Sequence, residues 1–168
     1  MPVSLDRLTL GPRRIMGIDL GERRIGVAIG DPGANTASPF TTLSRGKTVE
    51  DDASTISRIA AEQGAGALVV GLPLNMDGSE GLQAARTREW AEAVAVASGL
   101  ALRYRDERLT CERAERRIGK ASRGRSGGPP SAAQLEAYRA RIDREAAALI
   151  LQDDLDATSM ENPNRRSV

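Results

Sequence analysis

The sequence contains no histidine and only one cysteine, Cys111, among its 168 residues. The absence of histidine excludes catalytic systems of the Ser-His-Asp and Cys-His types, and structural zinc sites are excluded because they need several Cys or His ligands. A single cysteine cannot form a disulfide within the chain, which suits a reducing cytoplasm, and Cys111 is interpreted as a small, unreactive residue. Any chemistry must therefore depend on carboxylates, hydroxyls, arginine or the backbone.

Aromatic residues and long apolar runs are also scarce. The chain has one Phe, one Trp and two Tyr, so stacking of bases on aromatic rings is excluded as the main way of holding a nucleic acid. The longest mostly apolar run, at 67–74, is far shorter than the roughly 20 residues that a membrane span needs. The N-terminus lacks the apolar stretch of a signal peptide. We expect a soluble, cytoplasmic protein that does not bind membranes.

Positive and negative charges nearly cancel, with 24 basic and 23 acidic residues, but they are unevenly placed. Nine basic and four acidic residues fall between positions 103 and 125, whereas 145–161 contains five acids and no base. Only two basic residues of the whole chain are lysines, and the guanidinium of arginine binds phosphate groups well. Residues 103–125, which we call the basic segment, are therefore predicted to bind an anion.

The order of local patterns predicts one α/β domain with a mixed sheet. Short apolar runs at 13–21 and 23–31, joined by a tight polar turn, predict a β-hairpin, and 37–45 is predicted as an edge strand because it contains Pro39. Strands at 67–73 and 100–108 then alternate with helices at 48–64, 81–99 and around 111–119, and a last helix follows the Gly/Pro-rich stretch 120–131. We expect a domain over 14–156, with a flexible arm at 1–13 and a disordered tail at 157–168.

Acidic residues occupy three positions that such a sheet can gather. Asp19 ends the first predicted strand, Asp106 and Glu107 close the strand at 100–108 on opposite faces, and Asp143 lies on the flank of the apolar face of the last helix. Each position also has a structural interpretation: a turn residue, a salt-bridged strand end and an exposed helix residue. Together, however, the three positions supply the oxygen ligands that a hard divalent cation such as Mg²⁺ prefers, and two such ions can hydrolyse a phosphodiester without histidine.

Four segments resemble, in order and spacing, the YqgF family of ribonuclease H-like proteins: GIDLGERRIGVAIGDP, VVGLPLNMDGSEG, YRDERLT and IDREAAALILQDDLD. The resemblance covers roughly residues 14–156. Members of this family are described as pre-16S rRNA nucleases and as Holliday-junction resolvases. The resemblance implies a ribonuclease H-like α/β fold, in which a five-stranded mixed sheet with its first three strands antiparallel is flanked by helices.

The resemblance also implies roles for individual residues. The catalytic acids would be Asp19, Asp106, Glu107 and Asp143, and the ligands of Mg²⁺ or Mn²⁺ would be Asp19, Glu107 and Asp143. Glu107 is favoured over Asp106 as the third ligand.

Contacts with nucleic acid are expected from the basic segment and from the loop that follows the strand at 67–73. The predicted contact residues are Arg108, Arg113, Arg116, Arg117, Asn75 and Gly78. For the loop, a plain strand-to-helix connection is an equal alternative. The chain departs from the family where the longer stretch 120–131 and SAAQLEAYRAR precede Asp143, so no contact is carried over there.

The leading hypothesis is a metal-dependent nuclease, a hydrolase of phosphodiester bonds in structured nucleic acid, that processes the 5′ end of pre-16S rRNA in ribosome biogenesis. One alternative is a Holliday-junction resolvase that cuts four-way junction DNA as a dimer in recombination or repair. A second alternative is an RNA-binding ribosome-assembly factor without catalytic activity. The protein is expected to be a monomer or a homodimer.

Overall fold

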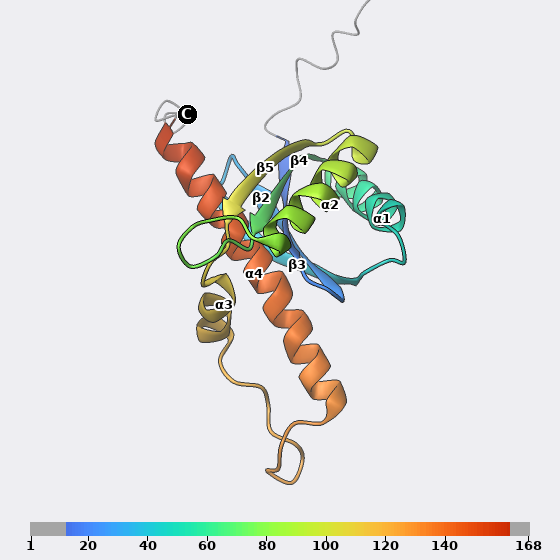
Figure 1. Ribbon diagram of the computed structural model, residues 1–168. Helices are drawn as coiled ribbons and strands as arrows, with labels where there is room; N and C mark the ends of the chain where they lie inside the picture. Colours follow the sequence, from blue (N-terminus) through green and yellow to red (C-terminus); the bar gives the residue numbers. More distant parts are fainter. Residues whose placement is uncertain (1–12, 162–168) are drawn as a thin grey trace, which may run out of the picture.

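The computed structural model describes residues 13–161, which form a sheet flanked by helices (Figure 1). The strands are β1 (Arg14–Leu20), β2 (Arg24–Asp31), β3 (Thr36–Ser44), β4 (Ala65–Leu72) and β5 (Ala101–Asp106). They lie in the order β3-β2-β1-β4-β5. The first three strands are antiparallel, β4 is parallel to β1, and β5 is parallel to β4. The structure confirms the mixed sheet, and the strand that contains Pro39 lies at its edge as predicted.

The helices are α1 (Val49–Gln63), α2 (Leu82–Ser98), α3 (Thr110–Ile118) and α4 (Ala132–Glu161). Helix α1 begins at a capping box of Thr48 and Asp51 and ends at Gly64, whose left-handed φ of 67° suits glycine. Helices α1 and α2 cover one face of the sheet, while α4 crosses the other face and packs against α3. No helix within residues 13–161 has the length and apolar character to span a membrane.

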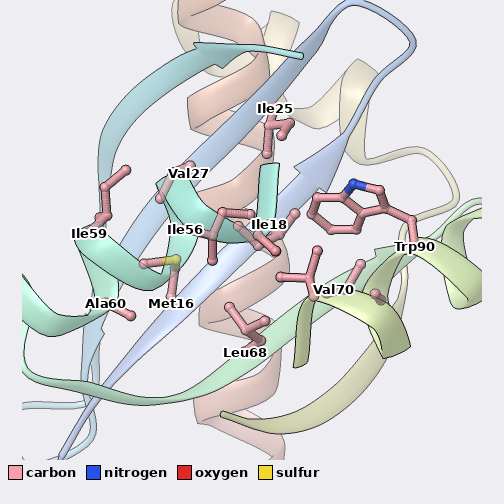
Figure 2. Close-up of a cluster of buried hydrophobic side chains, with 13 residues drawn as sticks. Met16, Ile18, Ile25, Val27, Ile56, Ile59, Ala60, Leu68, Val70 and Trp90 are labelled. Carbon is pink, nitrogen blue, oxygen red and sulfur yellow. The ribbon is translucent and has the colours of Figure 1, made fainter. Parts of the chain in front are cut away.

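Alternate side chains of the strands supply two separate cores. On the face of α1 and α2, Met16 and Ile18 of β1 are buried with Trp90 of α2 (Figure 2). On the other face, Ile15 is buried against α4. This alternation places Asp19 on the α4 side of the sheet, because odd-numbered residues of β1 face α4.

Small residues let α4 lie unusually close to the sheet. A Cβ at Gly17 would lie 2.7 Å from Leu151 Cβ and 2.8 Å from the Ala147 carbonyl oxygen. A Cβ at Gly26 would collide with the carbonyl oxygen of Asp143. The backbone of α4 therefore rests directly on β2 at Gly26 and lies close to β1 at Gly17.

The predicted boundary at residue 156 is too early. Helix α4 continues through residues 157–161, which the sequence assigns to a disordered tail. Leu155 is still buried against the sheet, and Thr158 Oγ1 donates to the Asp154 carbonyl oxygen, so both contacts support the last turn of the helix. The rest of that tail, 162–168, and residues 1–12 of the expected N-terminal arm lie outside the described residues.

Candidate active site

Asp19 and Asp143 are brought together by Gly26. Asp19 is the direct partner of Gly26 in the antiparallel register of β1 and β2, and the backbone of Asp143 lies on Gly26 from the α4 side. Two residues that are 124 positions apart in the sequence therefore share one glycine as a neighbour. Burial raises the pKa of Asp19 most, and the negative charge of Asp143 raises it further.

Glu107 reaches the same place from the end of β5. Its backbone N–H donates to the Leu72 carbonyl oxygen at 3.1 Å, and its side chain lies over Gly71, where a Cβ would be 2.6 Å from Glu107 Oε2. From there the Glu107 side chain forms a hydrogen bond with Asp19. Glycine at position 71 therefore leaves room for the Glu107 side chain beside Asp19, because a Cβ there would push on Glu107 Oε2 and on Ile150 Cδ1.

The Asp19 and Glu107 carboxyl groups carry strongly raised pKa values. Burial, followed by the negative charge of Asp19, raises the pKa of Glu107 to about 9. Burial also raises the pKa of Asp19 to about 6, against the opposing effect of its hydrogen bond with Glu107. At neutral pH without a cation, Glu107 therefore keeps its proton and donates it in a hydrogen bond to the Asp19 carboxylate.

Asp143 forms an ion pair with Arg24 of β2. Arg24 Nε lies 2.5 Å from Asp143 Oδ2, and Arg24 Nη1 lies 3.1 Å from Glu136 Oε1 in the preceding turns of α4. In residues 13–161, no three acidic, cysteine or histidine side chains converge on one point as metal ligands. Asp19 and Glu107 form the convergent pair, and Asp143 stands beside them with one oxygen held by Arg24.

Asp106 lies outside this group. Its carboxylate accepts from Arg108 Nε at 2.8 Å and from the Arg108 backbone N–H at 2.9 Å, and the Arg108 guanidinium lowers its pKa. Neighbouring residues at the end of a strand point in opposite directions, so only one acid of the DER motif can face α4. The structure brings Glu107, not Asp106, to Asp19.

Comparison with known proteins assigns the family. The sequence model of the family described as "RuvX: Holliday junction resolvase" matches residues 13–157. The chain belongs to the RuvX family. This is the YqgF family that the four sequence segments resemble, so that resemblance is confirmed.

Two curated relatives of the chain share one name. An Anaeromyxobacter sp. protein named "Putative pre-16S rRNA nuclease" is 43% identical over 143 residues, which cover 85% of this chain and 96% of the relative. A protein of the same name from Acidiphilium cryptum is 38% identical over 152 residues, which cover 89% of this chain and 88% of the relative. These matches extend over nearly the whole domain.

Among solved structures, RuvC of Thermus thermophilus is similar with a TM-score of 0.50, over 88% of this chain and 96% of that chain, at 12% sequence identity. At this identity the likeness concerns the fold alone. Together with the strand order of the sheet, it identifies the ribonuclease H-like α/β fold that the sequence predicted.

The residues expected to contact nucleic acid in this RuvX-family chain are engaged within the protein. Arg113 binds Asp153 at 2.8 Å and Arg117 binds Glu145 at 3.1 Å, and the exposed Arg116 lies 3.9 Å from Glu112. These contacts place the three arginines of α3 in ion pairs with α4 or with their own helix.

The loop between β4 and α2 is fixed by its own hydrogen bonds. Asn75 Nδ2 donates to Ser79 Oγ at 3.0 Å, and Gly78 takes a left-handed φ of 87° in the turn. Arg108 Nη1 donates to the Met76 carbonyl oxygen at 3.0 Å, which ties the loop to the DER segment. Arg108, Asn75 and Gly78 thus shape the loop beside the acids.

Sequence reasoning missed Arg24, Gly26 and Gly71, which control how the acids meet. A signal for Gly26 existed, because Gly26, Ala28 and Gly30 alternate along β2 and so present one small-residue face to a packed helix. No local signal pairs Arg24 with Asp143, since the two residues are far apart in the sequence.

The raised carboxyl pKa values make the stability of the metal-free protein depend on pH. Stability that comes from the protonated forms is fully present below the ordinary carboxyl range and is lost as pH rises through about 6 for Asp19 and about 9 for Glu107. We therefore expect the thermal unfolding temperature, measured in EDTA, to decrease as the pH rises from about 6 to about 9. Glutamine at position 107 cannot ionise, so the unfolding temperature of the Glu107→Gln variant should decrease less over this range. At pH 9 the variant should be more stable than the wild-type protein. Equal pH slopes for the two proteins would contradict the assignment of the raised pKa to Glu107.

Proposed function

We propose that the protein is a divalent-metal-dependent nuclease that hydrolyses phosphodiester bonds in structured nucleic acid, and that its substrate is the 5′ end of pre-16S rRNA. The observation that carries this proposal is the meeting of Asp19 and Glu107 beside Asp143 on one face of a ribonuclease H-like sheet. The names of the relatives at about 40% identity support the choice of RNA precursor.

The donor set fits a hard divalent cation. The carboxyl groups of Asp19 and Glu107 lie together at a site where burial makes their negative charge unfavourable, and this raises the pKa of both groups. A cation of charge +2 would offset that electrostatic cost. Oxygen ligands are those that Mg²⁺ and Mn²⁺ prefer. We propose Mg²⁺ or Mn²⁺, held by Asp19 and Glu107 and by the oxygen of Asp143 that Arg24 does not bind.

The bound metal would activate water and stabilise the leaving oxygen of the phosphodiester. The chain's own residues prepare the site for this role. To hold the metal, Glu107 would release its proton to solvent so that both carboxylates could act as ligands, and Arg24 keeps the Asp143 side chain oriented through Oδ2. The nearby Cys111 thiol has its pKa raised to about 11 by burial and by the acidic groups, so it stays protonated at neutral pH and offers no thiolate nucleophile.

The deciding experiment compares two substrates and three metal conditions. Purified protein is incubated with an RNA that carries the extended 5′ end of 16S rRNA, and separately with a four-way DNA junction, in Mg²⁺, Mn²⁺ or EDTA. We expect cleavage of the RNA precursor with either metal and none in EDTA. Cleavage that persists in EDTA would overturn the metal-dependent mechanism.

The family description favours one second candidate, a Holliday-junction resolvase. Resolution requires two symmetry-related cuts and therefore a dimer. Paired cuts in the four-way junction by a dimeric protein, with the RNA left intact, would select this candidate. Binding of RNA without any cleavage would instead indicate an assembly factor.

A further inference from the structure

The basic segment divides at Gly119 into a part that is paired with acids and a part that is not. Before Gly119, ion pairs with acidic side chains are formed by Arg103, Arg105, Arg108, Arg113, Arg116 and Arg117. Two of these arginines bind Asp154, which is fully buried: Arg103 at 2.6 Å and Arg105 at 2.8 Å. Most of this charge therefore stabilises the contact of α4 with its neighbours.

Beyond Gly119, the basic side chains that the structure describes have no such partners. Within residues 13–161, no ion pair is formed by Lys120, Arg123, Arg125, Arg139 or Arg141. We call residues 119–141 the arm, which consists of the loop before α4 and the first turns of α4. The arm contains five basic residues and one acid, Glu136, and that acid is bound by Arg24 of β2. The arm is thus a strongly positive part of the surface.

Hydrogen bonds hold the arm in a defined shape. Tyr138 Oη donates to the Gly119 carbonyl oxygen at 2.8 Å, and Gln134 Nε2 donates to the Arg123 carbonyl oxygen at 3.3 Å. Ser131 and Gln134 cap the start of α4 through reciprocal bonds of 2.8 Å and 3.1 Å. The loop is therefore tied to α4 at both of its ends, and the basic side chains project from an ordered backbone.

The arm extends away from the acids along α4. Arg139 precedes Asp143 by one helical turn and lies on the same side of the helix. From Asp143 back to Ala132 the helix spans about 16 Å at ~1.5 Å per residue. Figure 1 shows this part of α4 and the preceding loop continuing beyond the edge of the sheet. Phosphates of one strand of a DNA duplex repeat about every 3.4 Å along its axis, and those of an A-form RNA duplex lie closer together, so this length of helix matches at least about five base pairs of RNA.

We propose that the arm binds the phosphate backbone of a double-stranded RNA stem that flanks the bond to be cut, over at least about five base pairs. The proposal rests on the proposed nuclease function and specifies its substrate. A duplex is favoured over a single strand because the arm contains one aromatic residue, Tyr138, whose hydroxyl group is engaged and whose ring packs between α3 and α4. Without a stacking surface, the arm can hold phosphates but not unpaired bases.

The test measures RNA binding in EDTA, so that cleavage does not interfere. The ligands are an RNA with a stem of about ten base pairs next to the scissile bond, the same RNA with a stem of about two, and its unpaired counterpart. We expect the Arg123→Gln, Arg125→Gln and Arg139→Gln triple variant to bind the long stem about tenfold or more weakly near 100 mM salt. The slope of log affinity against log salt should become shallower by about 2 to 3. Affinity for the short stem and the unpaired strand should hardly change.

Arg86→Gln provides the matched control. Arg86 is an exposed arginine on α2, on the opposite face of the sheet, and it forms no ion pair within the described residues. This control should change long-stem affinity less than twofold, and all variants should keep the wild-type unfolding midpoint because the substituted side chains are exposed. Wild-type binding by the triple variant, or an equal loss on the unpaired strand, would overturn the role of the arm.

The proposal for the arm and the proposal for the nuclease function are contradicted by different results. If the wild-type protein cleaves RNA but the triple variant binds the long stem normally, the arm proposal is wrong and the function stands. If the triple variant loses long-stem binding but the wild-type protein cleaves no RNA with any metal, the arm proposal stands and the proposed function is wrong. If the wild-type protein binds none of the RNAs, both are wrong.

Discussion

Replacing Asp19 with asparagine is expected to lower metal-dependent cleavage at least about a thousandfold, since a catalytic metal supplies several kcal/mol and each factor of ten corresponds to about 1.4 kcal/mol. Asp19 interacts with both Glu107 and Asp143, so its loss removes an oxygen ligand that is shared by the interactions of the proposed site. The same variant should bind Mn²⁺ much more weakly in calorimetry. It should remain folded, because it removes a buried negative charge and keeps the shape of the side chain.

Asp106→Asn is the matched control for this experiment. It makes the same chemical change a short distance away, in a carboxylate that Arg108 holds outside the site. We expect at most a severalfold effect on cleavage and unchanged Mn²⁺ affinity. Equal losses in the Asp19 and Asp106 variants would contradict the assignment of the site, and unchanged cleavage by Asp19→Asn would overturn it.

Replacing Gly26 with alanine is expected to destabilise the protein by about 3 kcal/mol or more, at the upper end of the effects of overpacking. The added methyl group would meet the carbonyl oxygen of Asp143, and neither the strand nor the helix backbone can move aside as a flexible side chain does. Helix α4 must shift away from β2, which also moves Asp143 away from Asp19. Denaturant unfolding in EDTA measures the loss of stability, and metal titration measures the effect on the site.

Gly128→Ala tests whether the effect is specific to close packing. A Cβ at Gly128 meets nothing within 4 Å, so the same change of residue should alter the free energy of unfolding by less than about 1 kcal/mol. A Gly26→Ala protein as stable as the Gly128→Ala protein would show that α4 does not rest on β2 as closely as the structure indicates.

Much of the fold follows from local patterns in the sequence. The runs around Asp19 and Gly26 predict a hairpin, Pro39 predicts an edge strand, and alternation places neighbouring residues on opposite faces. These features depend on the periods of strands and helices, which are properties of short stretches of chain. For the same reason, the sequence could state that Asp106 and Glu107 point in opposite directions.

The sequence could not state which of those two acids meets Asp19. That choice depends on which face of the sheet α4 covers, and on glycine at positions 26 and 71 allowing the backbone of α4 and the side chain of Glu107 to approach. It is therefore decided by packing between elements that are far apart in the chain.

Charge shows the same division between local and long-range information. The sequence by itself determined that basic residues concentrate at 103–125 and that carboxylates and arginine are the available chemical groups, because composition is independent of the fold. Only the tertiary structure decided which basic side chains are neutralised. Asp154 binds Arg103 and Arg105 from about 50 residues away, whereas Arg123 and Arg125 form no ion pair within residues 13–161. The physical reason is that an ion pair depends on distance in space, and folding sets that distance.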